Sequence, residues 1–231
     1  MSVITIYGRP KVGKTTLALK DAPKAKTAVF SADQGLLGID TKGMTILEDL
    51  STRNINKEVN SRFLAQHQRF VVDTATSLHT LFQQESAGSP GAQIRKQDFG
   101  SANNALATLI RTLKDSKKTV IVLAQERLIV PGQGLGTDGK DEWTPEDVDE
   151  DVQAMTTVDL SQGAASAVLQ MSDAIGRLYI ANVDGKVYRR LWLGPSASII
   201  AGARSDKYHG TPPYLKQPSI GRLNQLLGWA N

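Results

Sequence analysis

Eight consecutive residues near the start of the chain have the types and spacing needed to hold a phosphate group. They match the pattern G-x-x-x-x-G-K-[ST] in full and read Gly8-Arg9-Pro10-Lys11-Val12-Gly13-Lys14-Thr15. The glycines let the backbone curl around an anion, so that successive N–H groups point at its oxygen atoms. We expect Lys14 to reach the β- and γ-phosphates, the Thr15 hydroxyl to ligate Mg²⁺ and Thr16 to lie near the α-phosphate. This segment predicts binding of a nucleoside triphosphate, with ATP and Mg²⁺ as the expected pair.

A phosphate site of this kind also needs a carboxylate on the metal side, at the end of a neighbouring strand. Residues 70–72 are a short apolar run typical of a buried strand, and Asp73 follows them directly. An aspartate at a strand end can instead cap a turn, which is the structural alternative. Beside a complete phosphate-binding segment, the position predicts that Asp73 joins Thr15 as a metal ligand.

Further polar side chains at strand ends could act on a bound triphosphate. Asp33 follows the strand expected at residues 27–30, where a carboxylate can orient or deprotonate a water molecule. Gln125 follows the strand expected at residues 119–124 and can donate to a phosphate oxygen, while Glu126 is a competing candidate for activating water. The structural alternatives are an Asx turn at Asp33 and an amide satisfied by backbone at Gln125.

Short apolar runs alternate with amphipathic stretches, which indicates an α/β fold with a mainly parallel central sheet flanked by helices. The expected strands cover residues 3–7, 27–30, 44–47, 70–72, 119–124 and 197–201. The expected helices cover residues 15–20, 52–66, a stretch that begins after a cap at Ser101, 164–171 and 219–227. A turn at residues 183–185 separates two apolar runs and predicts a C-terminal β-hairpin.

No repeat or linker divides the chain, so we expect one domain over residues 1–231, with long loops at 83–98 and 127–163. The sequence contains no cysteine and no apolar run of the roughly 20 residues that a membrane-spanning helix needs. The first ten residues predict a strand rather than a signal peptide. We therefore expect a soluble, cytoplasmic protein without a membrane partner.

The net charge of +4 conceals a separation of acidic and basic residues. Residues 138–151 hold eight acids and one lysine, and the rest of the chain has 26 Lys and Arg against 15 Asp and Glu, a net charge of +11. A basic body favours a polyanion such as nucleic acid as a partner, although ordinary surface lysines can give the same balance. The acidic run is typical of a solvated loop.

Four segments, in order and in spacing, resemble the RecA core, a family of P-loop ATPases. They are the phosphate-binding segment and the runs VFSADQG at 29–35, FVVDTATSL at 70–78 and VIVLAQ at 120–125. The resemblance implies a RecA-like fold, ATP hydrolysis with Asp33 activating water, and Gln125 sensing the γ-phosphate ahead of a DNA-binding loop. The short chain, the hairpin at 179–193 and the segment 203–207 are similar to phage-encoded RecA-like ATPases of the single-strand-annealing type.

This resemblance implies a DNA-dependent ATPase that acts on single-stranded DNA in recombination or annealing, in the host cytoplasm if phage-encoded. RecA-like proteins form rings or filaments that place the nucleotide between subunits, so we expect a homo-oligomer in which Arg204 and Lys207 act on a neighbour's γ-phosphate. We expect nucleic-acid contacts from Arg95, Lys96 and Arg127, and a single-strand-binding protein is a candidate partner. Two alternatives are a P-loop small-molecule kinase and a nucleotide-switched binding module with little turnover. A GTPase is disfavoured because the sequence lacks an N-K-x-D motif.

Overall fold

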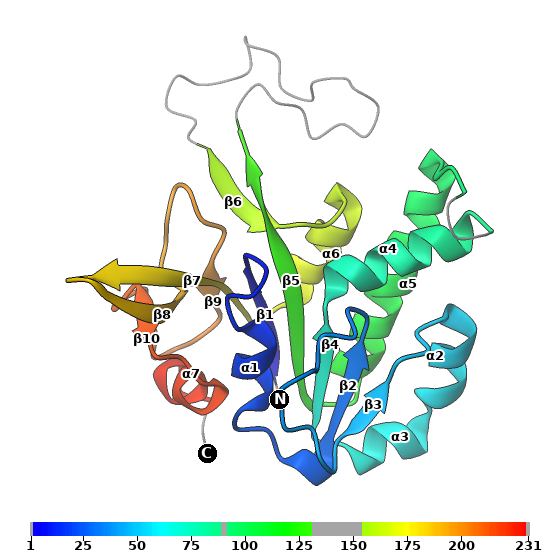
Figure 1. Ribbon diagram of the computed structural model, residues 1–231, viewed down its shortest axis with the longest axis horizontal. Coiled ribbons are helices and arrows are strands. Elements are labelled where there is room, and N and C mark those ends of the chain that lie inside the picture. The colour runs from blue at the N-terminus through cyan, green and yellow to red at the C-terminus, as the bar shows by residue number, and fades with distance from the viewer. Residues whose placement is uncertain (1, 89–91, 131–153, 230–231) are drawn as a thin grey trace.

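The computed structural model describes residues 2–88, 92–130 and 154–229. Its strands form a sheet in the order β10-β8-β7-β1-β5-β4-β2-β3, with β6 paired to β5 and β9 paired to β7 (Figure 1). The strand bounds are β1 (Ser2–Gly8), β2 (Thr27–Ser31), β3 (Thr45–Leu47), β4 (Arg69–Asp73), β5 (Thr119–Ile129), β6 (Met155–Val158), β7 (Ala174–Val183), β8 (Lys186–Trp192), β9 (Gly202–Ala203) and β10 (Tyr214–Lys216).

Helices cover both faces of the sheet. Their bounds are α1 (Lys14–Leu19), α2 (Thr52–Glu58), α3 (Ser61–Gln66), α4 (Ala75–Ser86), α5 (Lys96–Asp115), α6 (Gln162–Met171) and α7 (Ile220–Leu227), with a short 3₁₀ turn at Lys24–Lys26. Helices α4, α5 and α6 contribute to the apolar core on one face, and α1 and α7 contribute to the core on the other. No helix in the described ranges is long and apolar enough to span a lipid bilayer.

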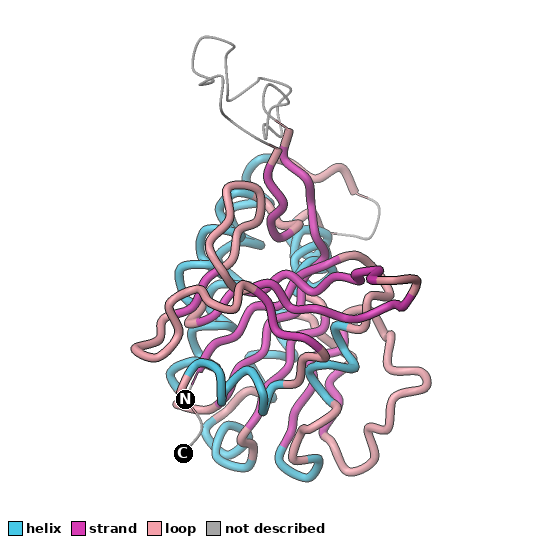
Figure 2. Tube along the Cα trace, turned by 90° about the vertical axis from the view of Figure 1, so that its left-hand side faces the viewer, coloured by secondary structure: helices cyan, strands magenta, loops and turns pink. Residues whose placement is uncertain are grey.

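The central strands are buried on both faces, which explains their nearly continuous apolar sequences. In β4, Phe70 and Val72 belong to one core and Val71 belongs to the other, because successive side chains in a strand point to opposite sides. The neighbours of β1, β2, β4 and β5 within the main sheet are parallel, whereas β7, β8 and β10 pair antiparallel to one another. The predicted fold, a mainly parallel sheet with flanking helices and a C-terminal hairpin, is confirmed. The hairpin of β7 and β8 extends from one side of the molecule in Figure 1, and this side faces the viewer in Figure 2.

Several predicted boundaries are wrong. Helix α4 runs to Ser86 and α5 begins at Lys96, so the loop expected at 83–98 is shorter at both ends. The cap of α5 is not Ser101, because Asp98 accepts from the backbone N–H of Arg95 at 2.7 Å and the helix starts there. Residues 197–201, expected as a strand, form none: Ile199 makes an isolated bridge with Thr156, and β9 begins at Gly202.

Both ends of the loop expected at 127–163 belong to regular elements, including a two-stranded ribbon of β5 and β6. Strand β5 continues to Ile129 and pairs antiparallel with β6, and α6 begins at Gln162. The acidic run at 138–151 lies outside the described residues. The ribbon therefore begins directly after Gln125, the last residue of β5 that pairs with β1.

Candidate nucleotide site

The carboxyl ends of β1, β2 and β4 meet at one edge of the sheet, where β5 also stops pairing with β1. Gly8 at the end of β1 lies opposite Gln125 in β5, and Asp73 at the end of β4 lies opposite Ser31 in β2. Asp33 follows Ser31 two residues later. In open α/β sheets, ligands bind outside the carboxyl ends of the strands. The fold therefore gathers the residues predicted for phosphate, metal and water at the edge where a ligand is expected.

The phosphate-binding loop connects β1 to α1 and depends on its glycines. A Cβ atom at Gly8 would lie 2.2 Å from the carbonyl oxygen of Leu178 in β7, so no larger residue fits. Gly13 caps the start of α1 with a φ of 97°, a left-handed conformation that favours glycine. In the middle of the loop, Val12 is buried against the core, whereas Arg9, Pro10 and Lys11 are exposed, as is Thr16 in α1. The loop is thus fixed at both ends by backbone geometry.

We expect Gly8→Ala to lower the free energy of unfolding by about 1–3 kcal/mol, because the new methyl group must displace the β7 backbone. Gly100 in α5 is a matched control, since nothing lies within 4 Å of its missing Cβ atom. Gly100→Ala should raise stability by up to about 1 kcal/mol. Urea denaturation of the two variants and the wild type measures both changes in the free energy of unfolding, the decrease and the increase. Equal stability of Gly8→Ala and the wild type would contradict the close approach.

Lys14 is buried inside the loop. Its Nζ donates to the carbonyl oxygens of Gly8 at 2.8 Å and Arg9 at 3.0 Å, and to Oε1 of Gln125 at 2.8 Å. Burial lowers the pKa of the ammonium, while the charges of Asp73, Asp33 and Glu126 oppose that shift. All three hydrogen-bond acceptors are neutral groups. A buried ammonium gains more from a charged oxygen than from a neutral one, so phosphate is a strong competitor for this donor.

Thr15 and Asp73 lie next to each other, as predicted for metal ligands. Burial raises the pKa of Asp73 to about 6, a hydrogen bond with Thr15 and the charge of Lys14 oppose the shift, and the charge of Asp33 adds to it. An ionised carboxylate in this position is therefore costly unless a further cation is present. A divalent ion would supply that charge.

The donor set fits Mg²⁺ bound together with a nucleotide. Magnesium prefers oxygen ligands, and it is commonly held by one or two protein carboxylates, with phosphates and water completing the shell. Within the described residues, no group of three or more His, Cys, Asp or Glu side chains could hold a metal without a nucleotide. A hydroxyl from Thr15 and a carboxylate from Asp73 match the nucleotide-dependent type of site.

Asp33 is exposed and is positioned by β4. The backbone N–H of Asp33 donates to the carbonyl oxygen of Asp73 at 3.3 Å, and the Thr74 hydroxyl donates to Oδ1 of Asp33 at 3.3 Å. These contacts place its carboxylate close enough to affect the pKa values of Asp73 and Lys14. An exposed carboxylate beside the phosphate loop has the position that activation of water requires.

Gln125 connects the phosphate loop to the β5–β6 ribbon. Its side chain accepts from Lys14, its backbone N–H donates to the Thr76 hydroxyl at 3.0 Å, and its carbonyl oxygen accepts from the N–H of Asp159 at 2.8 Å. Thr76 in turn donates to the carbonyl oxygen of Asp159 at 2.9 Å. If Lys14 moved on phosphate binding, the movement would therefore be transmitted through Gln125 and Thr76 to Asp159, the residue that follows β6.

Glu126, the competing candidate for activating water, is occupied by ion pairs. Its carboxylate accepts from Nε of Arg9 at 3.0 Å and from Nε of Arg177 at 2.9 Å. Burial raises the pKa of Glu126, but the hydrogen bonds and charges of Arg177 and Arg9 outweigh it, so the pKa lies below its usual range. A carboxylate held by two guanidinium groups is a poor proton acceptor, which favours Asp33 for the role.

Several residues of the site were missed by the sequence analysis. Thr74 and Thr76 position Asp33 and Gln125, and Arg177 fixes Glu126 from β7. Arg189 in β8 lies against the phosphate loop, because a Cβ atom at Gly13 would be 3.0 Å from its Nε. The two threonines lie inside a run already assigned to the site. The arginines come from the hairpin, and only strand pairing shows that they approach the loop.

Arg204 lies at the opposite edge of the sheet from the phosphate loop. Its guanidinium donates to the carbonyl oxygen of Gln170 at 2.9 Å and lies 3.5 Å from the Asp173 carboxylate, beside the start of β1. β1 has seven residues, which corresponds to about 20 Å, so Arg204 does not reach the loop of its own chain. Lys207 is exposed, and its side-chain stem packs over Gly228 at the end of α7.

The residues predicted for nucleic-acid contacts lie on two separate elements. Arg95 and Lys96 begin α5, whereas Arg127 belongs to β5 and pairs with Thr157 in the ribbon. Within the described residues, the Nε atom of Arg127 is buried and has no hydrogen-bond partner. The structure does not bring the three residues onto one element.

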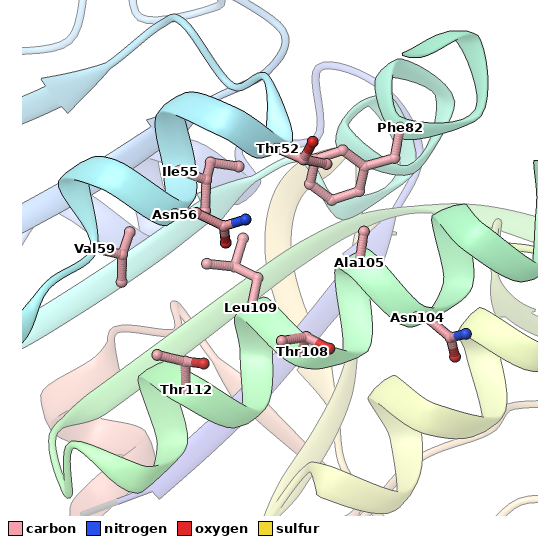
Figure 3. Close-up of a pocket in the computed structure, with 10 residues that line it drawn as sticks. All are labelled: Thr52, Ile55, Asn56, Val59, Phe82, Asn104, Ala105, Thr108, Leu109 and Thr112. Carbon is pink, nitrogen blue, oxygen red and sulfur yellow. The ribbon is translucent and has the colours of Figure 1, made fainter. Parts of the chain in front are cut away.

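Two pockets differ in what they could bind. A pocket of about 520 Å³ lies beside the phosphate loop, between Arg9–Val12 and the start of the hairpin, and Arg177 and Glu126 line it. A pocket of about 290 Å³ lies elsewhere, where Asn56 of α2 and Leu109 of α5 face each other (Figure 3). The second pocket has no ionisable side chain in its lining, so it offers no acid–base or phosphate chemistry. Of these two pockets, only the one beside the phosphate loop has ionisable side chains in its lining.

The chain is similar to one protein family and to two archaeal proteins of known structure. A family model described as AAA domain matches residues 2–205. A KaiC-like protein from Pyrococcus horikoshii OT3 is 13% identical, with a TM-score of 0.49 over 83% of this chain and 77% of that chain. The flagellar accessory protein FlaH from Methanocaldococcus jannaschii is 12% identical, with a TM-score of 0.45 over 95% of this chain and 87% of that chain. No curated protein sequence matches the chain.

Proposed function

This chain belongs to the AAA domain family, and from that premise we propose that it binds ATP with Mg²⁺ and hydrolyses the ATP to ADP and phosphate. The observation that carries the proposal is the convergence of Lys14, Thr15, Asp33, Asp73 and Gln125 at the ends of adjacent parallel strands. Each supplies a different requirement of phosphoryl transfer: a cation, two oxygen ligands, a carboxylate and a neutral donor.

The reaction transfers the γ-phosphoryl group to water. A water oxygen attacks the γ-phosphorus, the bond to the β-phosphate oxygen breaks, and the proton of the water passes to a base. Asp33 orients the water and accepts the proton, while Lys14 and the amide of Gln125 donate to oxygens on which charge develops. Thr15 and Asp73 would hold Mg²⁺, which supplies charge neutralisation on the phosphate oxygens when it is bound.

Asp33→Asn should lower kcat at least about 100-fold, because it removes the general base and keeps the shape of the side chain. Glu126→Gln is the matched control, since it makes the same change on a carboxylate that two arginines already hold. We expect that control to retain kcat within about tenfold of the wild type. Steady-state phosphate release from both variants measures the difference. A larger loss of kcat in Glu126→Gln than in Asp33→Asn would identify Glu126, and not Asp33, as the residue that activates water.

We propose single-stranded DNA as the substrate on which this ATPase acts, in annealing or recombination. Two features support the proposal: the charge of +11 outside residues 138–151, and the direct link from Lys14 through Gln125 to the ribbon that carries Arg127. Arg95, Lys96 and Arg127 remain the proposed contacts near the loops. Loss of the γ-phosphate would then alter the ribbon through Gln125.

We also propose that the protein works as an oligomer in which Arg204, with Lys207 nearby, reaches the nucleotide of a neighbouring subunit. The side chain of Arg204 is 64% exposed and lies at the sheet edge away from its own phosphate loop. A cation in that position is available to a second copy of the chain. Such a cation would stabilise the charge that develops on the γ-phosphate.

ATP turnover with and without single-stranded DNA, over a series of salt concentrations, tests the proposed function. We expect DNA to stimulate phosphate release and the stimulation to fade as salt rises, because phosphate contacts release counterions. Turnover that required a nucleoside or nucleotide acceptor would instead identify a small-molecule kinase. Tight ATP binding without turnover under any condition would identify a nucleotide-switched binding module.

A further inference from the structure

The outer part of the sheet is strongly basic. Strands β7, β8 and β10 together carry five Lys and Arg residues and no Asp or Glu. The same three strands carry four aromatic residues. Exposed strands of a stable domain normally mix both signs of charge, so this composition indicates a surface for an anionic partner.

Strand register places the aromatic residues on a single face. Tyr179 lies opposite Arg190, and Trp192 lies opposite both Arg177 and Tyr214. Residues directly opposite each other in antiparallel strands share a face, and so do residues two apart along one strand. We define the aromatic–basic face as six of the side chains that this register gathers: Tyr179, Tyr188, Arg190, Trp192, Tyr214 and Lys216. Arg177 shares the face but is paired with Glu126.

The opposite face is covered by the protein itself at the base of the strands, whereas Ile180 and Val187 near the turn of the hairpin are exposed. Leu178, Leu191 and Leu215 belong to the apolar core that includes Leu17 of α1 and Leu223 of α7. Because helices cover that face, the aromatic–basic face is directed away from them. Lys216 is exposed, and the other five side chains of the aromatic–basic face are partly exposed.

On this face a cation lies over one aromatic ring, and that ring lies beside a second one. The guanidinium of Arg190 lies 4.3 Å from the centre of the Tyr214 ring, and the Tyr214 and Trp192 rings are 6.2 Å apart with an interplanar angle of 31°. Within the described residues, Nε of Arg190 is buried and has no hydrogen-bond partner. The face therefore offers flat π surfaces next to the partly exposed guanidinium of Arg190 and the exposed ammonium of Lys216.

We propose that the aromatic–basic face binds single-stranded DNA, with bases stacked on Tyr179, Tyr188 and Trp192 and phosphates held by Arg190 and Lys216. Sequence-tolerant single-strand binding combines these two components, a row of aromatic platforms and cations along the backbone. The bases of duplex DNA are stacked on each other and cannot stack on the exposed rings. An acidic protein segment would contact the cations of this face but would not use its aromatic rings. The choice of DNA over RNA rests on the proposed function.

Fluorescence anisotropy of a labelled dT oligonucleotide, titrated with the full chain, tests the face. We expect Tyr188→Ala to weaken binding about tenfold, which corresponds to loss of one stacked base. Lys216→Glu should weaken binding and reduce the salt dependence, since one phosphate contact contributes about 0.7 to the slope for a single strand. Tyr188→Phe and Lys42→Glu are the controls, because the first keeps the ring and the second makes the same charge change at an exposed lysine before β3.

A second readout does not depend on a disruptive variant. The emission of Trp192 should be quenched on binding dT, and Trp192→Phe should abolish most of the quenching while it retains binding. If both Tyr188→Ala and Lys216→Glu bound dT as tightly as the wild type, the aromatic–basic face would not be the DNA-binding site, but the proposed function would be unaffected. Preference for an RNA or duplex probe over dT would also overturn it. Failure of the wild type to bind dT, with ATP turnover intact, would remove DNA from the proposed function as well.

Discussion

Lys14→Ala should lower the ATPase kcat at least about 100-fold, a loss comparable to removing a principal donor to a developing oxyanion. Lys14 is the buried cation of the site, and its present partners are the neutral oxygens of Gly8, Arg9 and Gln125. Without the ammonium, the γ-phosphate loses its charged donor, and Asp33 and Asp73 lose a neutralising neighbour. Steady-state phosphate release at saturating Mg²⁺ and ATP measures the effect.

Lys11→Ala is the matched control for this experiment. Lys11 belongs to the same loop, but it is exposed and has a φ of 62°, a strain that alanine shares. We expect its turnover to remain within a few-fold of the wild type. If Lys11→Ala lost as much activity as Lys14→Ala, or if Lys14→Ala kept the wild-type rate, the assignment of the phosphate loop would be wrong.

Asp73→Asn should stabilise the protein without nucleotide and abolish Mg²⁺-dependent turnover, two effects of opposite sign. Burial raises the pKa of Asp73 from 3.8 to about 6 in the folded protein. One pKa unit corresponds to about 1.4 kcal/mol, so ionised Asp73 costs up to about 3 kcal/mol at neutral pH. Asparagine keeps the shape of the side chain and avoids that cost. Loss of the metal ligand should lower kcat at least about 100-fold.

The pH dependence of stability distinguishes this explanation from better packing in the variant. The raised pKa of Asp73 gives the wild type a stabilisation that is present below pH 3.8 and lost as the pH rises through about 6. Wild type and Asp73→Asn should therefore unfold alike near pH 4 and diverge towards pH 8. Saturating Mg²⁺ and ATP should narrow or reverse the gap, because only the wild type gains full binding energy. A gap independent of pH would contradict the buried charge.

Most of the nucleotide site could be predicted because its residues lie at the ends of short, strongly apolar strands. The phosphate loop is continuous in sequence. Asp73 ends β4, Asp33 follows β2 by two residues, and Gln125 follows the apolar residues of β5, and burial on both faces makes these apolar runs easy to recognise. Parallel pairing then brings those ends together whatever the details of the loops. Element boundaries were less predictable, as at α5, where Asp98 rather than Ser101 sets the start of the helix.

The contributions of the hairpin could not be predicted from local sequence. Arg177 is 51 residues from Glu126, and only the pairing of β7 beside β1 makes them neighbours. Alternation of Tyr188, Arg190 and Trp192 is visible in the sequence at a period of two residues. Their common face becomes apparent only when β10, an element that the sequence does not signal, adds Tyr214 beside Trp192.

A single-turnover experiment tests the central claim that Lys14, Asp33, Asp73 and Gln125 form a hydrolytic site. ATP labelled at the γ-phosphate would be mixed with an excess of wild-type protein and Mg²⁺, and the products would be separated over time. We predict that the bound label appears as inorganic phosphate, and that Asp33→Asn keeps ATP bound and intact. Recovery of unchanged ATP from the wild-type protein, or appearance of the label only on an added acceptor, would contradict the claim.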